Sequence, residues 1–89
     1  MTYQVLLRQD ADRELDKLTE PNRKAVVIAI ISLQENPRPS GVKKLIDSVF
    51  WRIKVGKFRV IYSINDDKKV VLIVRVCKRN ERTYENLWN

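Results

Sequence analysis

The chain has 89 residues, a formal net charge of +7 at pH 7 and a hydrophobic fraction of 44%. That length and apolar content predict one small globular domain over residues 1–89 and exclude a disordered chain. The positive charge is concentrated in the second half, where residues 46–89 hold ten Lys and Arg against five Asp and Glu. A concentrated positive field favours phosphate-rich partners.

The scarcity of histidine and cysteine limits the kinds of catalytic and metal site that the chain can form. The sequence has no histidine and a single cysteine, Cys77. An internal disulfide, a multi-cysteine metal site and Ser-His-Asp or Cys-His catalysis are therefore excluded, and acid–base steps fall to Tyr, Lys, Arg, Asp or Glu. No signal-peptide pattern and no run of about 18 apolar residues is present, so we expect a cytoplasmic protein without a membrane span.

The first half of the chain predicts a strand followed by two helices. Tyr, Val and Leu alternate within residues 2–8, as in a strand. A helix should follow to about residue 17, capped by Asp10, and a second should run from a Thr19 cap to about residue 35, with Pro21 in its first turn. The second helix is apolar over much of its surface, which predicts a helix hairpin packed on one face of a sheet.

Residues 50–63 predict a β-hairpin. Gly56 occupies the first central position of a two-residue turn, where a type II′ turn needs positive φ. The turn fixes the pairing, which places six side chains on one apolar face: Trp51, Ile53, Val55, Phe58, Val60 and Tyr62. The opposite face then gathers Arg52, Lys54 and Arg59, either as a solvated basic face or as a place for an anion.

The remaining segments complete an α+β fold. We expect residues 42–49 to be a connection, residues 65–68 a turn, and the apolar run 70–76 an interior strand buried on both sides. Arg75 within that run could pair with a buried acid or bind phosphate. A short helix is expected within residues 78–89. The predicted order is β-α-α-β-β-β, with a four-stranded, largely antiparallel sheet.

Cleaving an RNA phosphodiester requires a base for the 2′-hydroxyl, cations around the developing charge and an acid for the leaving oxygen. Suitable residue types are Arg52, Lys54, Arg59, Arg79 and Tyr84. Tyr84 could instead be a half-buried anchor, and Arg79 and Arg82 a solvated tail. Trp51 and Tyr62 are better explained as core than as base-stacking residues, and Cys77 as a small buried residue.

Together these residues resemble the RelE/ParE superfamily of toxins. The resemblance spans the chain and is carried by WRIKVGKFRVIY at residues 51–62, VRVCKR at 74–79 and Tyr84. It implies a RelE-like toxin of a type II toxin–antitoxin system that cleaves mRNA in the ribosomal A site. Products would be a 2′,3′-cyclic phosphate and a 5′-hydroxyl, with no metal or small-molecule cofactor. The expected partners are a cognate antitoxin and the ribosome carrying mRNA.

The resemblance also implies a division of roles. Arg52, Lys54 and Arg59 would hold the scissile phosphate, Arg79 would assist the leaving group, and Tyr84 would be the general base or orient the 2′-hydroxyl. Further cations are expected to contact RNA: Lys43, Lys44, Lys57, Lys78 and Arg82. Two alternatives stay open: a ParE-like toxin that poisons DNA gyrase without cleaving RNA, and a basic binding module that has lost toxicity.

Overall fold

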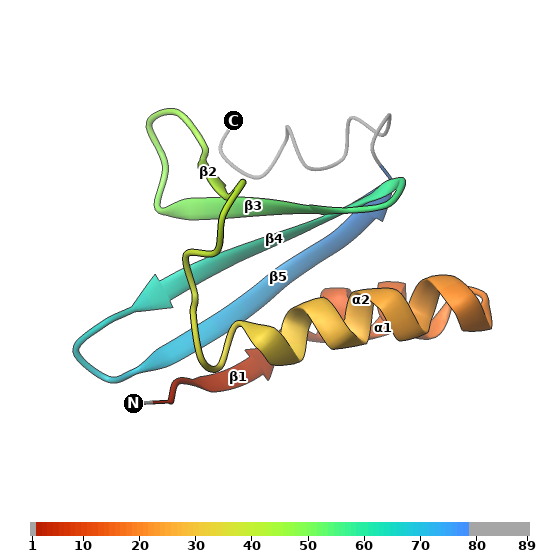
Figure 1. The fold of residues 1–89 in the computed structure, drawn as a ribbon, viewed down its shortest axis with the longest axis horizontal. Helices are drawn as coiled ribbons and strands as arrows, with labels where there is room; N and C mark the ends of the chain where they lie inside the picture. Colours follow the sequence, from red (N-terminus) through yellow and green to blue (C-terminus); the bar gives the residue numbers. More distant parts are fainter. Residues whose placement is uncertain (1, 79–89) are drawn as a thin grey trace.

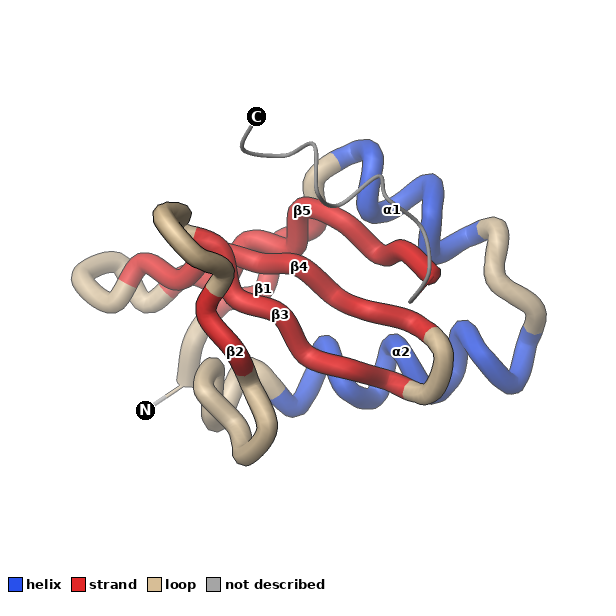
Figure 2. Tube along the Cα trace, turned by 90° about the horizontal axis from the view of Figure 1, so that it is seen from above, coloured by secondary structure: helices blue, strands red, loops and turns tan. Residues whose placement is uncertain are grey.

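A computed structural model describes residues 2–78 of the chain. Its five strands form one sheet in the order β1-β5-β4-β3-β2, in which only the β1–β5 pair is parallel. Helices α1 and α2 cover one face of this sheet (Figure 1), and Figure 2 shows the strands from above. The elements are β1 (Gln4–Leu7), α1 (Gln9–Asp16), α2 (Glu20–Ser32), β2 (Lys43–Lys44), β3 (Phe50–Val55), β4 (Phe58–Asn65) and β5 (Val70–Lys78).

This arrangement confirms the α+β class and the helix hairpin on one sheet face, but the prediction of four strands was wrong. The segment expected to be a connection contains β2, in which Lys43 pairs with Arg52 and Lys44 with Trp51. Two lysines carry no apolar alternation, so the sequence gives no sign of this strand. The expected C-terminal helix lies outside the described residues. Neither helix within residues 2–78 is long and apolar enough to cross a membrane.

The helix ends differ from the predicted ones. Arg8 is the N-cap of α1, so Asp10 lies inside the first turn and does not cap it, although its charge still suits the positive helix terminus. Thr19 is the N-cap of α2 as predicted, but its hydroxyl oxygen accepts a hydrogen bond from the Asn22 amide (3.0 Å) and caps no backbone N–H. α2 ends at Ser32, three residues before the predicted end.

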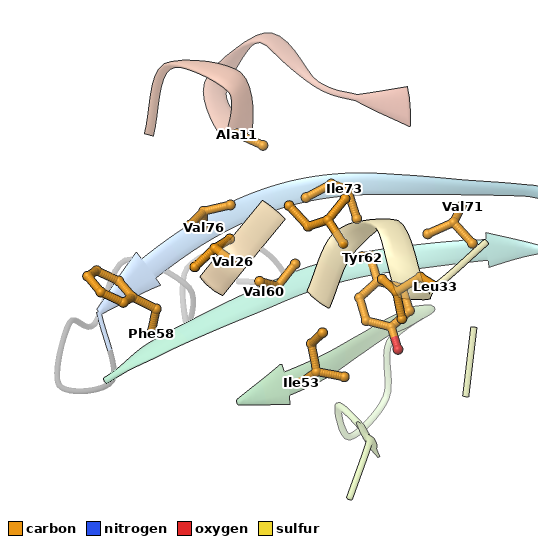
Figure 3. Packing of buried hydrophobic residues seen from close by; sticks show 11 residues of the cluster. Ala11, Val26, Leu33, Ile53, Phe58, Val60, Tyr62, Val71, Ile73 and Val76 are labelled. Carbon is orange, nitrogen blue, oxygen red and sulfur yellow. The ribbon is translucent and has the colours of Figure 1, made fainter. Parts of the chain in front are cut away.

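The core lies between the helices and the sheet (Figure 3). The hairpin face predicted to be apolar packs into it, and so does one side of α1, where Ala11 is fully buried. The largest fully buried side chain is Tyr62, whose hydroxyl donates to the Pro37 carbonyl oxygen at 2.7 Å. The buried cluster consists of Ala11, Val26, Ile30, Leu33, Ile53, Phe58, Val60, Tyr62, Val71, Ile73 and Val76.

β5 is the predicted interior strand, with β1 on one side and β4 on the other. Its pairing with β4 contains a bulge: Tyr62 lies opposite Ile73, whereas Ile61 lies opposite Arg75. Val74 is therefore the extra residue on β5. β1 pairs with β5 only as far as Ile73, so the second half of β5 has no strand partner on that side within residues 2–78.

Candidate functional site

The β3–β4 hairpin has the predicted register, with Arg52 opposite Ile61, Lys54 opposite Arg59 and Val55 opposite Phe58. Gly56 has φ 60°, as a type II′ turn requires at its first central position. Side chains directly opposite each other lie on the same sheet face. Arg52, Lys54 and Arg59 therefore share the face turned away from the helices, and we call these three residues the basic face.

The three cations differ in exposure. Lys54 is exposed and Arg52 is half-buried, whereas Arg59 has only 8% of its surface exposed. Of the two interpretations of this face, a fully solvated one does not fit Arg59, because its side chain is largely shielded from water. Cys77 lies opposite Arg59 and is buried, with its sulfur 3.9 Å from the Arg59 carbonyl oxygen. The interpretation of Cys77 as a small buried residue is confirmed.

Register separates the two lysines of β2. Lys43 lies opposite Arg52 and so adds a fourth cation beside the basic face. Lys44 lies opposite Trp51 on the helix side, with its ammonium nitrogen 5.9 Å from the centre of the Trp51 ring. Trp51 packs against the core, as expected.

The other expected RNA contacts are also divided. Lys57 is exposed in the hairpin turn, next to the basic face. Lys78 lies opposite Phe58, on the helix side of the sheet, and lines a pocket with Lys17, the residue that follows α1. Arg79, Arg82 and Tyr84 lie outside the described residues.

Arg75 is a partner of Glu14 on α1. Its guanidinium donates three hydrogen bonds to that carboxylate, the shortest at 2.7 Å, and these bonds raise the pKa of Arg75 above its ordinary value. The same carboxylate accepts the Val76 N–H at 2.9 Å. Glu14 thus bonds the edge of β5 just after the bulge. Of the two possibilities left open for Arg75, the structure supports the acid partner.

Comparison with known proteins gives a consistent result. The family model described as "ParE toxin of type II toxin-antitoxin system, parDE" matches residues 5–83. A putative toxin RelE1 of Methanocaldococcus jannaschii is 30% identical over 90 residues, which cover 97% of this chain and 99% of the relative. This chain belongs to the RelE/ParE toxin family.

Solved structures of similar proteins support the assignment of this chain to the RelE/ParE toxin family. The RelBE2 toxin–antitoxin complex of Mycobacterium tuberculosis contains a chain with TM-score 0.80 and 29% identity, covering 89% of the toxin and 100% of that chain. The archaeal RelE–RelB complex of Pyrococcus horikoshii gives TM-score 0.81 and 28% identity, with 91% and 99% covered. These relatives carry the RelE name, so the gyrase-directed alternative is not favoured.

Sequence reasoning missed a polar cluster at one end of the toxin's sheet. Asp66 accepts hydrogen bonds from the Arg38 guanidinium (2.9 and 3.2 Å) and from the Tyr3 hydroxyl (2.6 Å). These bonds lower the pKa of Asp66 to about 2. Arg38 also lies over the Trp51 ring, 5.0 Å from its centre. The cluster ties the loop after α2 to the end of β4.

Sequence reasoning also missed a groove of about 420 Å³ at the sheet edge beside β3. Its lining includes Ala29 and Ser32 of α2, Ser40 of the following loop, and the lysines Lys43 and Lys54. We call this the edge groove. Its residues come from separate segments, and neither serine has a local signal that predicts a site. Within residues 2–78, no three His, Cys, Asp or Glu side chains are grouped as a metal site would need.

Proposed function

We propose that the toxin is an endoribonuclease that cleaves mRNA in the ribosomal A site and so inhibits translation. The observation that carries the proposal is the basic face, where three cations are aligned by strand register. A rigid hairpin holds these cations in place before substrate arrives. Preorganised charge of this kind stabilises a phosphorane-like transition state without reorganisation during the reaction.

In the proposed reaction Arg52, Lys54 and Arg59 bind the non-bridging oxygens of the scissile phosphate. Arginine suits this role because its planar fork can donate two parallel hydrogen bonds to one phosphate. The low exposure of Arg59 supports a strong interaction, since charges attract more strongly where water is partly excluded. Among the remaining cations we propose RNA contacts for Lys43 and Lys57, because register separates Lys44 and Lys78 from this face.

The proton transfers are assigned by resemblance to the family. Tyr84 takes the proton of the 2′-hydroxyl, whose oxygen attacks the phosphorus. The P–O5′ bond breaks, and Arg79 assists the departing 5′-oxygen by donating the proton that completes the 5′-hydroxyl. Nearby cations lower the pKa of a tyrosine, which makes it a better base near neutral pH. The products are a 2′,3′-cyclic phosphate and a 5′-hydroxyl, and the scheme uses no metal. Dependence on the ribosome follows because a site without histidine needs its substrate positioned for it.

We further propose a cognate antitoxin as the partner that neutralises the toxin. The solved structures from Mycobacterium tuberculosis and Pyrococcus horikoshii are both toxin–antitoxin complexes, which supports this partner. The net charge of +7 favours an antitoxin that is acidic where it contacts the toxin.

Primer extension on a translated message tests the proposal. Wild-type toxin should produce cleavage within A-site codons, whereas Arg79→Ala combined with Tyr84→Phe should not. Arg59→Lys, which keeps the charge but loses the fork, should cleave more slowly than wild type, and Lys68→Ala, in the exposed turn after β4, is the matched control.

Three results would contradict the proposal. If wild-type toxin cleaves no more than the Arg79→Ala, Tyr84→Phe variant, the proposed endoribonuclease activity is refuted. Inhibition of gyrase supercoiling with intact RNA would support the ParE-like alternative. Harmless overexpression of soluble, folded protein would indicate a module that has lost toxicity.

A further inference from the structure

The edge groove has the charge of an anion site. Lys43 and Lys54 lie along it, Ser40 adds a hydroxyl, and none of its lining residues within the described chain is acidic. The nearby C-terminus of α2 opposes an anion, because helix carbonyls there carry partial negative charge. The Ser32 hydroxyl offsets part of this effect by donating to the Ala29 carbonyl oxygen at 2.6 Å.

The groove is continuous with the basic face. Lys43 lies opposite Arg52, and Lys54 lies opposite Arg59. The two pairs are neighbours, because Arg52 and Lys54 are two residues apart on the same face of β3. Neighbouring strands are separated by roughly 4.8 Å, so the four cations form a staggered row that leads from Arg59 on β4 across β3 to Lys43 on β2. That row ends at the edge of the sheet, where the groove opens.

We propose that the edge groove binds a second backbone phosphate of the RNA, adjacent to the scissile one. Lys43 supplies the main charge, Lys54 lies between the two phosphates, and Ser40 donates a hydrogen bond. This inference rests on the proposed function and adds the path of the RNA, which leaves the sheet over β2 toward the C-terminal end of α2. The small side chain of Ala29 leaves room for the ribose-phosphate backbone.

The adjacent lysines of β2 provide the test. Toxin binding is measured with ribosomes whose A-site codon carries 2′-deoxy nucleotides and cannot be cleaved, over a range of KCl concentrations. Removal of one phosphate contact on a single strand lowers the slope of log affinity against log salt by about 0.7. Lys43→Ala should show that decrease and several-fold weaker binding, whereas Lys44→Ala, on the opposite face, should keep the wild-type slope.

A charge series at Ser32 gives an independent measurement. Ser32 is exposed at the end of α2, so substitutions there should leave the fold intact, as melting temperatures would verify. Ser32→Glu should weaken ribosome binding several-fold and Ser32→Lys should strengthen it, because they place opposite charges beside the same phosphate.

The proposal is overturned if Lys43→Ala and Lys44→Ala have equal salt slopes, or if the two Ser32 variants bind alike. It is also overturned if Lys43→Ala weakens only the binding of purified antitoxin, which would make the groove a protein-binding surface. Each of these outcomes is compatible with normal wild-type cleavage. Absence of wild-type cleavage would instead refute the proposed function, so the two failures are distinguishable.

Discussion

The contact between Glu14 and β5 should be one of the largest single contributions to the stability of the toxin. Its carboxylate accepts three hydrogen bonds from Arg75 and one from the Val76 N–H, at 2.7 to 3.1 Å. The exposed side-chain fractions are 16% for Arg75 and 23% for Glu14, so both charges are largely removed from water. Glu14→Ala would leave the arginine and the N–H without this acceptor.

The expected cost follows from that geometry. Removing one partner of a fully buried pair costs about 3–5 kcal/mol, and an exposed pair contributes at most about 1 kcal/mol. The partial exposure of both groups places Glu14→Ala between these limits, at about 2–3 kcal/mol. Glu14→Gln should cost about 1 kcal/mol, because its amide oxygen can still accept the Val76 N–H.

Urea denaturation followed by tryptophan fluorescence measures these differences. Glu20→Ala is the control, because Glu20 forms an exposed pair with Arg23 one turn along α2 and should cost less than about 0.5 kcal/mol. Combining Glu14→Ala with Arg75→Met should recover part of the loss, since neither charge of this pair then remains. The reasoning is refuted if Glu14→Ala is no more destabilising than Glu20→Ala, or if Arg75→Met recovers nothing.

Three other substitutions test separate features. Tyr62→Phe removes the buried bond to the Pro37 carbonyl and should lower the free energy of unfolding by about 1–3 kcal/mol in urea titrations, while equal stability would contradict the bond. Arg38 helps lower the pKa of Asp66 from 3.8 to about 2. The difference in stability between wild type and Asp66→Asn should therefore be constant above pH 5 and shrink as the pH falls from 4 towards 2. A difference that does not depend on pH would contradict the lowered pKa of Asp66. Gly56→Ala should cost about 1–2 kcal/mol in thermal denaturation because φ is 60°, although a Cβ there meets nothing within 4 Å; a neutral effect would exclude backbone strain.

The hairpin was predictable because its signals are local. Gly56 sets the turn, the turn sets the register, and alternation then assigns each side chain to a face. The same logic gave the burial of Tyr62 and the grouping of Arg52, Lys54 and Arg59. A strand without alternating apolar and polar residues cannot be recognised in this way, so β2, which consists of two lysines, was missed. The face of the sheet on which Lys78 lies could not be derived either, because β5 is apolar on both faces and contains a bulge.

Other features depend on residues distant in sequence. Glu14 and Arg75 are 61 positions apart, and a sequence offers several acids as partners for one buried arginine. The edge groove is lined by residues of α2, the loop after it and two strands, so no single segment of the sequence predicts it. Helix ends also remained imprecise. Asp is a better N-cap than Arg by about 1 kcal/mol, yet α1 begins after Arg8, which makes no side-chain cap hydrogen bond, so the local capping preference does not decide where this helix starts.

The bulge at Val74 sets a frame for the rest of β5. In a regular ladder continued from the Tyr62–Ile73 pair, Arg75 would lie opposite Val60 and point into the core, and Val76 would point out. The extra residue reverses this parity, so Val76 packs in the core and Arg75 and Cys77 lie on the other face. Deleting Val74 would therefore move every following side chain of β5 to the opposite face of the sheet. Homologous strands grafted onto the toxin must preserve the residue count between Ile73 and Val76, whatever their composition.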